Sequence, residues 1–353
     1  MVTRQPRGRS NGRPTLEEVA ARAGVGRGTV SRVINGSPRV SAHTREVVEA
    51  AVAELGYVPN TAARALAANR TDAIALVIPE PGPRFFSEPY FAEIISGVSA
   101  VLADTSLQLL LTLVGSDRER NRLSSYVGAH RVDGVLFVSL HAGDPLPDQL
   151  DELGIPTVVS GPRSADEPLP SVDSDNFAGA EAAVAHLRER GRRVIATITG
   201  RLDVYGAQRR LAGFRHAVAE AGLDDDPALV DHGDFSEEGG RRAMSELLRR
   251  RPDIDAVFAA SDVMASGARQ VLRENGRRIP EDVALIGFDD SPIARHMEPR
   301  LTSVRQPIEE MGRVMTELLL AEIADTAEHG PGPRRPGRRQ VVLPTDLIVR
   351  ASS

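Results

Sequence analysis

The N-terminal fold is decided by residues 15–35, which read TLEEVAARAGVGRGTVSRVIN. Thr15 and Glu18 have the T-x-x-E spacing of a capping box, so they are expected to begin a short amphipathic helix. The Gly-Val-Gly turn at 24–26 then ends that helix, and a second one is predicted over about 27–34. Two short helices around a tight turn are typical of a helix-turn-helix that reads DNA. An ordinary helical hairpin with a solvated polar face is the alternative.

The second helix presents a polar outer face. Val30 and Val33 share the inward face because they are three residues apart, so the polar residues around them point outward. Arginine bonds guanine O6 and N7 with two hydrogen bonds, while hydroxyls and a helix N-terminus suit phosphate oxygens. We therefore predict a DNA-reading surface here. Its predicted contacts are Thr15, Arg27, Gly28, Thr29, Ser31, Arg32 and Asn35.

A third helix and a short alanine-rich segment follow. Ser41 is placed to cap a helix that runs to about Leu55, with Gly56 directly after it. Three small helices complete a head. Residues 60–70 begin with Asn and are rich in alanine, but they are too few to form a stable helix alone. We expect this segment to need a partner that orders it.

Charge is divided unevenly along the 353 residues. Residues 1–70 carry eleven Arg and five Glu, a net charge of +6, whereas the whole chain has a net charge of −6. A basic head favours phosphate, and residues 1–14 are expected to be a disordered basic tail. The absence of cysteine excludes disulfides and thiolate metal sites. No apolar run is long enough for a membrane span and no signal peptide is evident, so a cytoplasmic protein is expected.

From residue 73 onward, short runs rich in Val, Ile and Leu alternate with amphipathic helical segments such as 90–103 and 177–190. This alternation is typical of parallel sheets covered by helices on both faces, so the predicted fold class of this part is α/β, doubly wound. Ligands of such folds bind at the carboxyl ends of the strands. The predicted strands are 74–78, 107–114, 134–140, 157–160, 194–199, 256–260 and 283–288.

The segment after the head resembles the hinge of the lac repressor family (LacI/GalR), whose pattern is Y-x-P-N-x-x-A-x-x-L. Tyr57, Pro59, Asn60, Ala63 and Leu66 match that pattern residue by residue. The resemblance implies a hinge helix that folds on operator DNA, with a leucine of each subunit wedged into the minor groove. A leucine wedge that kinks the duplex is physically reasonable, because bending brings more protein surface onto the DNA. The predicted DNA contacts of the hinge are Tyr57, Asn60, Ala63 and Leu66.

The core carries two further stretches that resemble this family. Residues 261–267, SDVMASG, are similar to its N-D-x-M-A-x-G block, and residues 279–290, IPEDVALIGFDD, to its P-E-D-V-x-V-x-G-F-D-D block. Ser261 replaces the common Asn, so an amide group is missing there. The resemblance implies a periplasmic-binding-protein-like core of two lobes joined by three crossings. The expected division is a tail 1–14, a head 15–57, a hinge 58–71 and a core 72–353, with lobe 1 about 72–162 and 304–334 and lobe 2 about 163–303 and 335–353.

Several charged residues are candidates for binding a small effector. Asp289 is expected to leave the carboxyl end of a strand, where a carboxylate accepts hydrogen bonds from sugar hydroxyls. Asp262 either does the same or caps the helix that follows it. The family resemblance implies that Arg210, in the stretch RRLAGF, is the arginine that reaches the ligand, and that Arg209 faces solvent.

Aromatic and strand-end residues complete the predicted pocket. The resemblance places Phe235 where an aromatic ring stacks on the effector, with core packing as the alternative. Residues 85–91 hold four aromatics, of which at least one is expected to touch the ligand. Asp173 and Asp175 flank a crossing between the lobes and either bind hydroxyls or cap a helix. The predicted effector contacts are Phe86, Tyr90, Phe91, Ser139, Asp175, Arg210, Phe235, Asp262 and Asp289.

The sequence weighs against an enzyme. No G-x-G-x-x-G follows a strand, a P-loop is impossible without lysine, and neither a Ser/His/Asp order nor H-E-x-x-H occurs. No cofactor and no metal are predicted. A transport-type sugar-binding protein is the stronger rival, but it would need a signal peptide and would lack the head.

The resemblance to the LacI/GalR family extends over most of the chain. It is greatest to actinobacterial repressors of cellulose utilisation that respond to cellobiose or cello-oligosaccharides, through stretches such as RQPRGRS, YVPNTAARALAANRTDAIALV and ATITGRLDVYGAQRR. It implies a homodimer that binds a palindromic operator and is released by a small carbohydrate. The alternative is a corepressor mode, in which a different small molecule tightens DNA binding.

Overall fold

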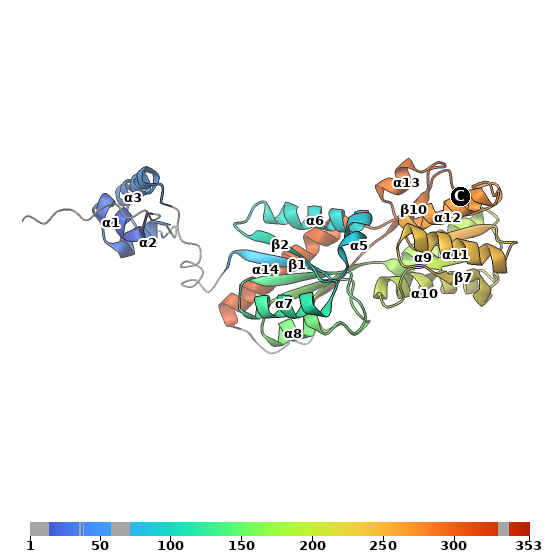
Figure 1. Ribbon diagram of the computed structural model, residues 1–353, viewed down its shortest axis with the longest axis horizontal. Coiled ribbons are helices and arrows are strands. Elements are labelled where there is room, and N and C mark those ends of the chain that lie inside the picture. The colour runs from blue at the N-terminus through green and yellow to red at the C-terminus, as the bar shows by residue number, and fades with distance from the viewer. Residues whose placement is uncertain (1–13, 35–36, 38, 58–70, 331–338) are drawn as a thin grey trace, which may run out of the picture. The chain divides into compact units, whose positions relative to one another are not determined.

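The computed structural model describes residues 14–34, 37, 39–57, 71–330 and 339–353 (Figure 1). The chain divides into two compact units, residues 1–71 and 72–353, and each is described by itself below. Of the predicted segments, the basic tail up to residue 13 and the hinge over 58–70 lie outside the described residues.

The described residues of the first unit form three helices packed around a small apolar core. Val19, Val30 and Val48 are fully buried at its centre, one from each helix. The predicted capping box is confirmed, because Glu18 N donates to Thr15 Oγ1 over 3.2 Å and Thr15 N donates to Glu18 Oε2 over 2.8 Å. All three helices begin and end as predicted: α1 (Leu16–Ala23), α2 (Arg27–Ile34) and α3 (Ala42–Leu55).

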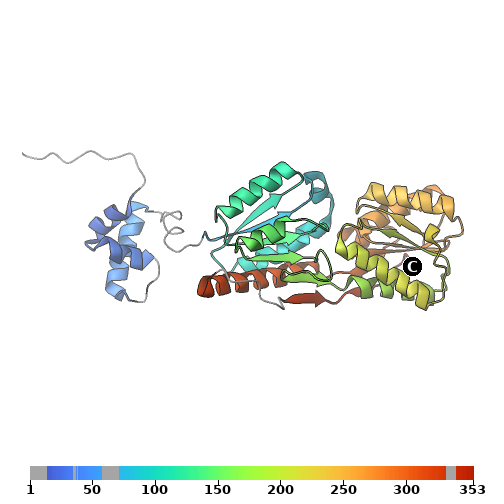
Figure 2. The ribbon, with the colours of Figure 1, turned by 90° about the horizontal axis from the view of Figure 1, so that it is seen from below.

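The second unit begins with a parallel six-stranded sheet in the order β11-β5-β4-β3-β1-β2. Helices α6 and α14 pack on one of its faces, and helices α7 and α8 pack on the other. Figure 2 shows this sheet between its helices. The elements are β1 (Ala73–Ile78), α5 (Gly82–Ser87), α6 (Pro89–Leu102), β2 (Gln108–Leu113), α7 (Asp117–Gly128), β3 (Gly134–Val138), α8 (Leu146–Glu152), β4 (Thr157–Ser160), β5 (Ser171–Ser174), α14 (Ile308–His329) and β11 (Gln340–Leu343).

A second six-stranded sheet has the order β12-β10-β9-β8-β6-β7, with β12 antiparallel to β10 and the other pairs parallel. Helices α11 and α12 cover one face, and α9 and α10 cover the other. The elements are α9 (Asn176–Glu189), β6 (Ile195–Thr199), α10 (Tyr205–Glu220), the 3-10 helix Pro227–Leu229, β7 (Val230–His232), α11 (Glu237–Arg250), β8 (Ala256–Ala259), α12 (Asp262–Glu274), β9 (Ala284–Asp289), α13 (Pro292–His296), β10 (Thr302–Arg305) and β12 (Asp346–Ile348).

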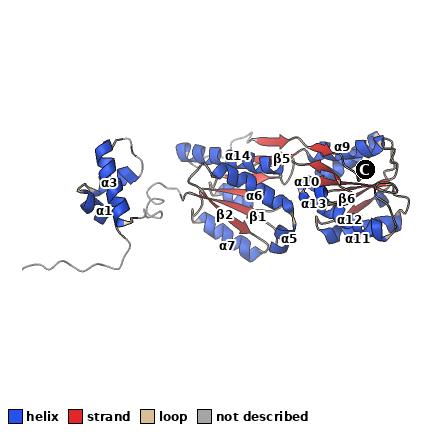
Figure 3. Ribbon diagram, turned by 90° about the horizontal axis from the view of Figure 1, so that it is seen from above, coloured by secondary structure: helices blue, strands red, loops and turns tan. Residues whose placement is uncertain are grey.

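The chain crosses between the two lobes three times (Figure 3). They join β5 to α9, β10 to α14, and β11 to β12. Asp175 N donates to the Leu343 carbonyl over 2.8 Å, and Thr345 Oγ1 donates to the Asp175 carbonyl over 3.2 Å. Ser174 Oγ donates to Gln306 Oε1 over 2.6 Å. The three connections therefore lie side by side.

The lobe boundaries differ from those expected. We expected 163–303 and 335–353 in the second lobe, but β5 and β11 belong to the first sheet, and β10 extends to Arg305 in the second. The reason is that β5, β10, β11 and β12 are short and partly polar, so they gave no apolar run to predict. All seven predicted strands are present, and their ends differ from the prediction by no more than two residues.

The longest helix, α14, lies unusually close to α6. A side chain on Gly97 would place its Cβ 2.0 Å from the Glu309 carbonyl oxygen, and one on Gly312 would place it 2.5 Å from the Ile94 carbonyl oxygen. Two glycines therefore let the backbones of these helices touch, which sets how α14 covers the first sheet.

We predict that Gly97→Ala lowers the free energy of unfolding by about 1–3 kcal/mol, because the added methyl forces α6 and α14 apart. Gly128→Ala is the control, since its Cβ meets only Leu153 Cδ1, at 3.7 Å. Urea unfolding of both variants checks this, and equal stability of the two would contradict the close approach.

Candidate nucleic-acid interface and ligand pocket

Helix α2 divides its residues between the head core and an open face. Val30 and Val33 are buried against α1 and α3. Arg27 Nη1 lies 2.9 Å from Glu17 Oε1, but both side chains are exposed, so water or phosphate can exchange for this contact at little cost. On the open face Arg27, Gly28 and Arg32 are exposed, whereas Thr29 and Ser31 are half-buried.

Other predicted DNA contacts have structural roles or lie outside the described residues. The Thr15 hydroxyl accepts the hydrogen bond that caps α1. Tyr57 is only 9% exposed and packs in the head core, so its ring stabilises the head. The predicted contacts that the structure does not describe are Asn35, Asn60, Ala63 and Leu66.

The core contains a cavity between its two lobes that is partly open to solvent, with a volume of about 870 Å³ when the solvent-open space is included. Its walls come from residues that follow the carboxyl ends of strands in both sheets, as expected for parallel sheets. Of the predicted effector contacts, Tyr90, Ser139, Arg210, Phe235 and Asp289 line it.

Arg210 of α10 is the centre of the polar wall. Its Nε donates to Asn176 Oδ1 over 2.8 Å, and its Nη1 donates to the Ala260 carbonyl over 2.5 Å. The guanidinium carbon lies 3.7 Å from the centroid of the Phe288 ring, and Nη1 lies 3.9 Å from Asp289 Oδ1. These contacts hold the buried side chain in one orientation towards the cavity.

Two carboxylates face this arginine. Asp289 accepts from Gln306 Nε2 over 2.6 Å, and Asp173 accepts from Asn176 Nδ2 over 3.0 Å. Burial raises the pKa of Asp173 to about 6 and raises that of Asp289 well above its ordinary value, while the Arg210 charge opposes both shifts. The pocket therefore offers acceptors and donors in pairs, the arrangement that neighbouring hydroxyls on a ligand require.

Three pocket residues have left-handed backbone conformations. Ser139 has φ 60°, Phe235 has φ 68° and Asp289 has φ 108°. Such angles are unfavourable for residues with a Cβ and are concentrated at binding sites in proteins. Here each one lies where a strand or loop turns into the cavity.

Four predicted effector contacts lie outside the cavity and are corrected. Phe86 is 82% exposed, and Phe91 is buried in the core under α14. Asp175 caps α9 by accepting from Ala178 N over 3.0 Å, so the capping alternative holds.

Asp262 is the fourth, and it neither lines the cavity nor caps α12. Ser261 is the cap, since its hydroxyl accepts from Met264 N. The Asp262 carboxylate is fully buried and accepts from Ser303 Oγ over 2.6 Å and Ser291 N over 2.7 Å. Burial raises its pKa to about 7. Asp262 thus ties β10 and α13 to the start of α12.

Several polar residues of the cavity are not among the predicted contacts. Arg84 and Glu88 lie in or beside the short helix α5, where no motif singled them out. Gln306 follows β10, a strand too short and polar to predict, and Asn176 begins α9 beside a crossing. Gln306 and Asn176 could have been predicted only if the end of β10 and the crossing before α9 had been recognised in the sequence.

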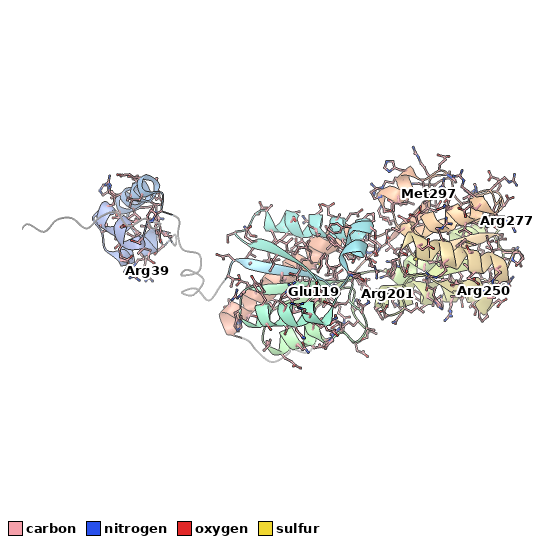
Figure 4. The ribbon with its side chains drawn as sticks, in the orientation of Figure 1. Arg39, Glu119, Arg201, Arg250, Arg277 and Met297 are labelled. Atoms are coloured by element: carbon pink, nitrogen blue, oxygen red, sulfur yellow. The ribbon has the colours of Figure 1, made fainter. Side chains whose placement is uncertain are left out.

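Beside the cavity, His141 bridges the two lobes. Its Nε2 lies 3.2 Å from Glu80 Oε1 in lobe 1, and its Nδ1 lies 3.2 Å from Asp203 Oδ2 in lobe 2. Ala142 N donates to the Asp203 carbonyl over 2.6 Å, and Arg201, labelled in Figure 4, pairs with the Asp203 carboxylate. The neighbouring Glu80 raises the pKa of His141 above its ordinary value.

We predict that His141→Gln destabilises the core more at acidic than at alkaline pH. The folded-state pKa is raised, so the stabilisation by His141 is complete below about 6.5 and is lost as pH rises through the folded-state value. Thermal unfolding of variant and unaltered protein across this range measures the difference. His216→Gln is the control, because the pair that His216 makes with Glu181 is largely exposed. A difference independent of pH would contradict the prediction.

Within the described residues, no cluster of His, Asp or Glu is arranged to hold a metal ion. Nor does any described helix have the length and apolar character needed to cross a membrane.

Both units of the chain match families of known proteins. Residues 15–60 match the model of bacterial regulatory proteins of the lacI family, and residues 184–353 match that of a periplasmic binding protein-like domain. The HTH-type transcriptional regulator CelR of Thermobifida fusca is 51% identical over 96% of this chain and 98% of its own. The regulator DegA of Bacillus subtilis is 34% identical over the same shares.

Solved structures agree with these matches. A transcriptional regulator CelR–cellobiose complex aligns with a TM-score of 0.75 at 49% identity, covering 97% of this chain and all of that one. A lac repressor dimer bound to operator and an anti-inducer aligns with a TM-score of 0.81 at 26% identity, covering 96% and 98%. The helix-turn-helix head, the two-lobed core and these similarities show that the chain belongs to the lacI family of bacterial regulatory proteins.

Proposed function

We propose that this protein is a transcriptional repressor that binds a palindromic operator as a homodimer and is released by cellobiose or a short cello-oligosaccharide. The proposal places it in the cytoplasm, associated with the nucleoid when bound to operator. It assigns the protein no enzymatic activity and no cofactor.

The observation that carries the proposal is the pocket around Arg210, in the same chain as a DNA-reading head. A sugar has adjacent hydroxyls that donate and accept, and an apolar C–H face. The cavity offers the carboxylates of Asp173 and Asp289, the amide of Asn176 and the aromatic ring of Phe235. The similarity to a regulator solved with cellobiose supports the same effector class.

The pocket joins both lobes, so a bound sugar favours the arrangement in which its two walls are close. Arg210 and Asp289 come from the second lobe, whereas Tyr90 and Ser139 come from the first. If that arrangement separates the two hinges of a dimer, sugar and operator oppose each other, and each weakens the affinity for the other by the same factor.

We predict that cellobiose releases the full chain from a palindromic duplex, and that Arg210→Lys weakens this response. Lysine keeps the charge facing Asp289 but loses the fork of donors, and one lost charged hydrogen bond weakens binding about ten- to a hundredfold. Operator affinity without sugar is expected to stay the same. Fluorescence anisotropy of a labelled duplex and calorimetry with cellobiose measure the two affinities.

Arg209→Lys is the matched control. Arg209 neighbours Arg210, but its guanidinium lies over Phe177, 4.7 Å from the ring centroid, and it does not line the cavity. Equal loss in both variants would show that Arg210 acts through folding and not through contact. Tighter operator binding with cellobiose would establish the corepressor mode, and no response to any carbohydrate would overturn the proposal.

For the head, we predict that Arg32→Ala costs about 1–3 kcal/mol on the cognate operator and much less on random DNA, because Arg32 is exposed on α2 and can read a base edge. Arg22→Ala removes the same charge from α1, where Arg22 pairs with Glu54. Binding titrations on both duplexes check this. Equal losses on cognate and random DNA would identify a phosphate contact instead.

A further inference from the structure

Arg84 enters the cavity from the lobe opposite Arg210. It belongs to α5, and its side chain is only 15% exposed. Nε donates to Glu88 Oε1 over 2.7 Å, and Nη1 donates to Glu80 Oε2 over 3.0 Å. Within the part of the chain that the structure describes, Nη2 has no hydrogen-bond acceptor, although the side chain lines the cavity. A guanidinium fixed by two carboxylates thus keeps a free pair of donors.

The ring of Phe235 lies across the cleft from this guanidinium. The Arg84 guanidinium carbon is 5.4 Å from the Phe235 ring centroid, near the outer limit of a cation–π contact. Behind the ring, a Cβ on Gly200 would lie 2.1 Å from Phe235 Cζ. The absence of a side chain at position 200 and the left-handed backbone of Phe235 therefore set where the ring lies.

Arg84 and Arg210 belong to separate polar clusters of one cavity. Arg84 is held by Glu80 and Glu88, whereas Arg210 is held by Asn176 and the Ala260 carbonyl, so the two share no hydrogen-bond partner. Both clusters nevertheless line the same cavity. One sugar ring needs one such cluster. A second cluster with its own aromatic face suits a second ring.

We propose that Arg84, with the Phe235 ring held by Gly200, forms a second sugar-ring subsite that makes the pocket select a disaccharide over a monosaccharide. The inference rests on the proposed function and adds the residues that read the second ring. Arg84 Nη2 donates to a hydroxyl of that ring, and Phe235 contacts its apolar face. Because the two parts of the subsite come from different lobes, the second ring also holds the lobes together.

The test compares cellobiose with glucose as ligands of the full chain by calorimetry. Arg84→Lys keeps a cation beside the buried Glu80 but removes the free Nη2 donors, and it is expected to weaken cellobiose binding about ten- to a hundredfold. Glucose binding, which needs only the Arg210 cluster, is expected to change less than twofold. Gly200→Ala, which displaces Phe235 without altering a polar group, is expected to weaken cellobiose binding selectively as well.

Arg120→Lys is the matched control, because Arg120 of α7 also pairs with a buried carboxylate, Asp144, but lies outside the cavity wall. If unaltered protein binds cellobiose and shows no measurable glucose binding, the second ring is required, and the loss in Arg84→Lys still identifies its partner. Equal affinity for glucose and cellobiose, or unchanged cellobiose binding by Arg84→Lys, overturns the subsite. Failure of unaltered protein to bind cellobiose refutes the effector assignment instead.

Discussion

The pocket depends on one buried positive charge, that of Arg210, and on the groups that stabilise it. Arg210 is buried between the lobes, and a guanidinium there is tolerated only when hydrogen bonds and opposite charges replace water. Asn176 and the Ala260 carbonyl supply hydrogen bonds, and Asp289 and Asp173 supply negative charge. The elements that carry these partners must therefore meet at one place. A ligand's hydroxyls would therefore meet polar groups that are already oriented and can still form hydrogen bonds.

Two residues of the second lobe hold this network in place, and one of them, Asp262, lies outside the cavity wall. Its buried carboxylate accepts from Ser291 N and Ser303 Oγ, and so it ties the segment that follows Asp289 to the neighbouring strand β10. Gln306 extends the network to a crossing, since it donates to Asp289 and accepts from Ser174. A change at Asp289 is thus transmitted to the connection between the lobes through two hydrogen bonds.

The sequence predicts the head and the main strands well, and the pocket in part. Capping residues such as Thr15 and Ser41 act within a few positions, so local pattern was enough to place the three helices. Arg210 and Asp289 were found because they lie in recognisable stretches. Arg84 was not, because its role depends on α5 facing Phe235 across the cleft, a contact that no local spacing encodes. Asp262 and Asp175 show the converse error, since a carboxylate at a helix start looks the same whether it meets a ligand or a backbone amide.

The three bonded crossings restrict how the two lobes can move. If one segment joined the two lobes, each lobe could rotate about three axes relative to the other. Three adjacent and bonded segments allow the lobes to bend about the line that joins the segments, but they resist twisting. The three crossings therefore restrict twisting of the two lobes more than bending. Because β11 and β12 supply one connection from the end of the chain, cleavage between Leu343 and Asp346 would release torsion without removing any pocket side chain. The C-terminal connection thus restrains the two lobes without lining the pocket.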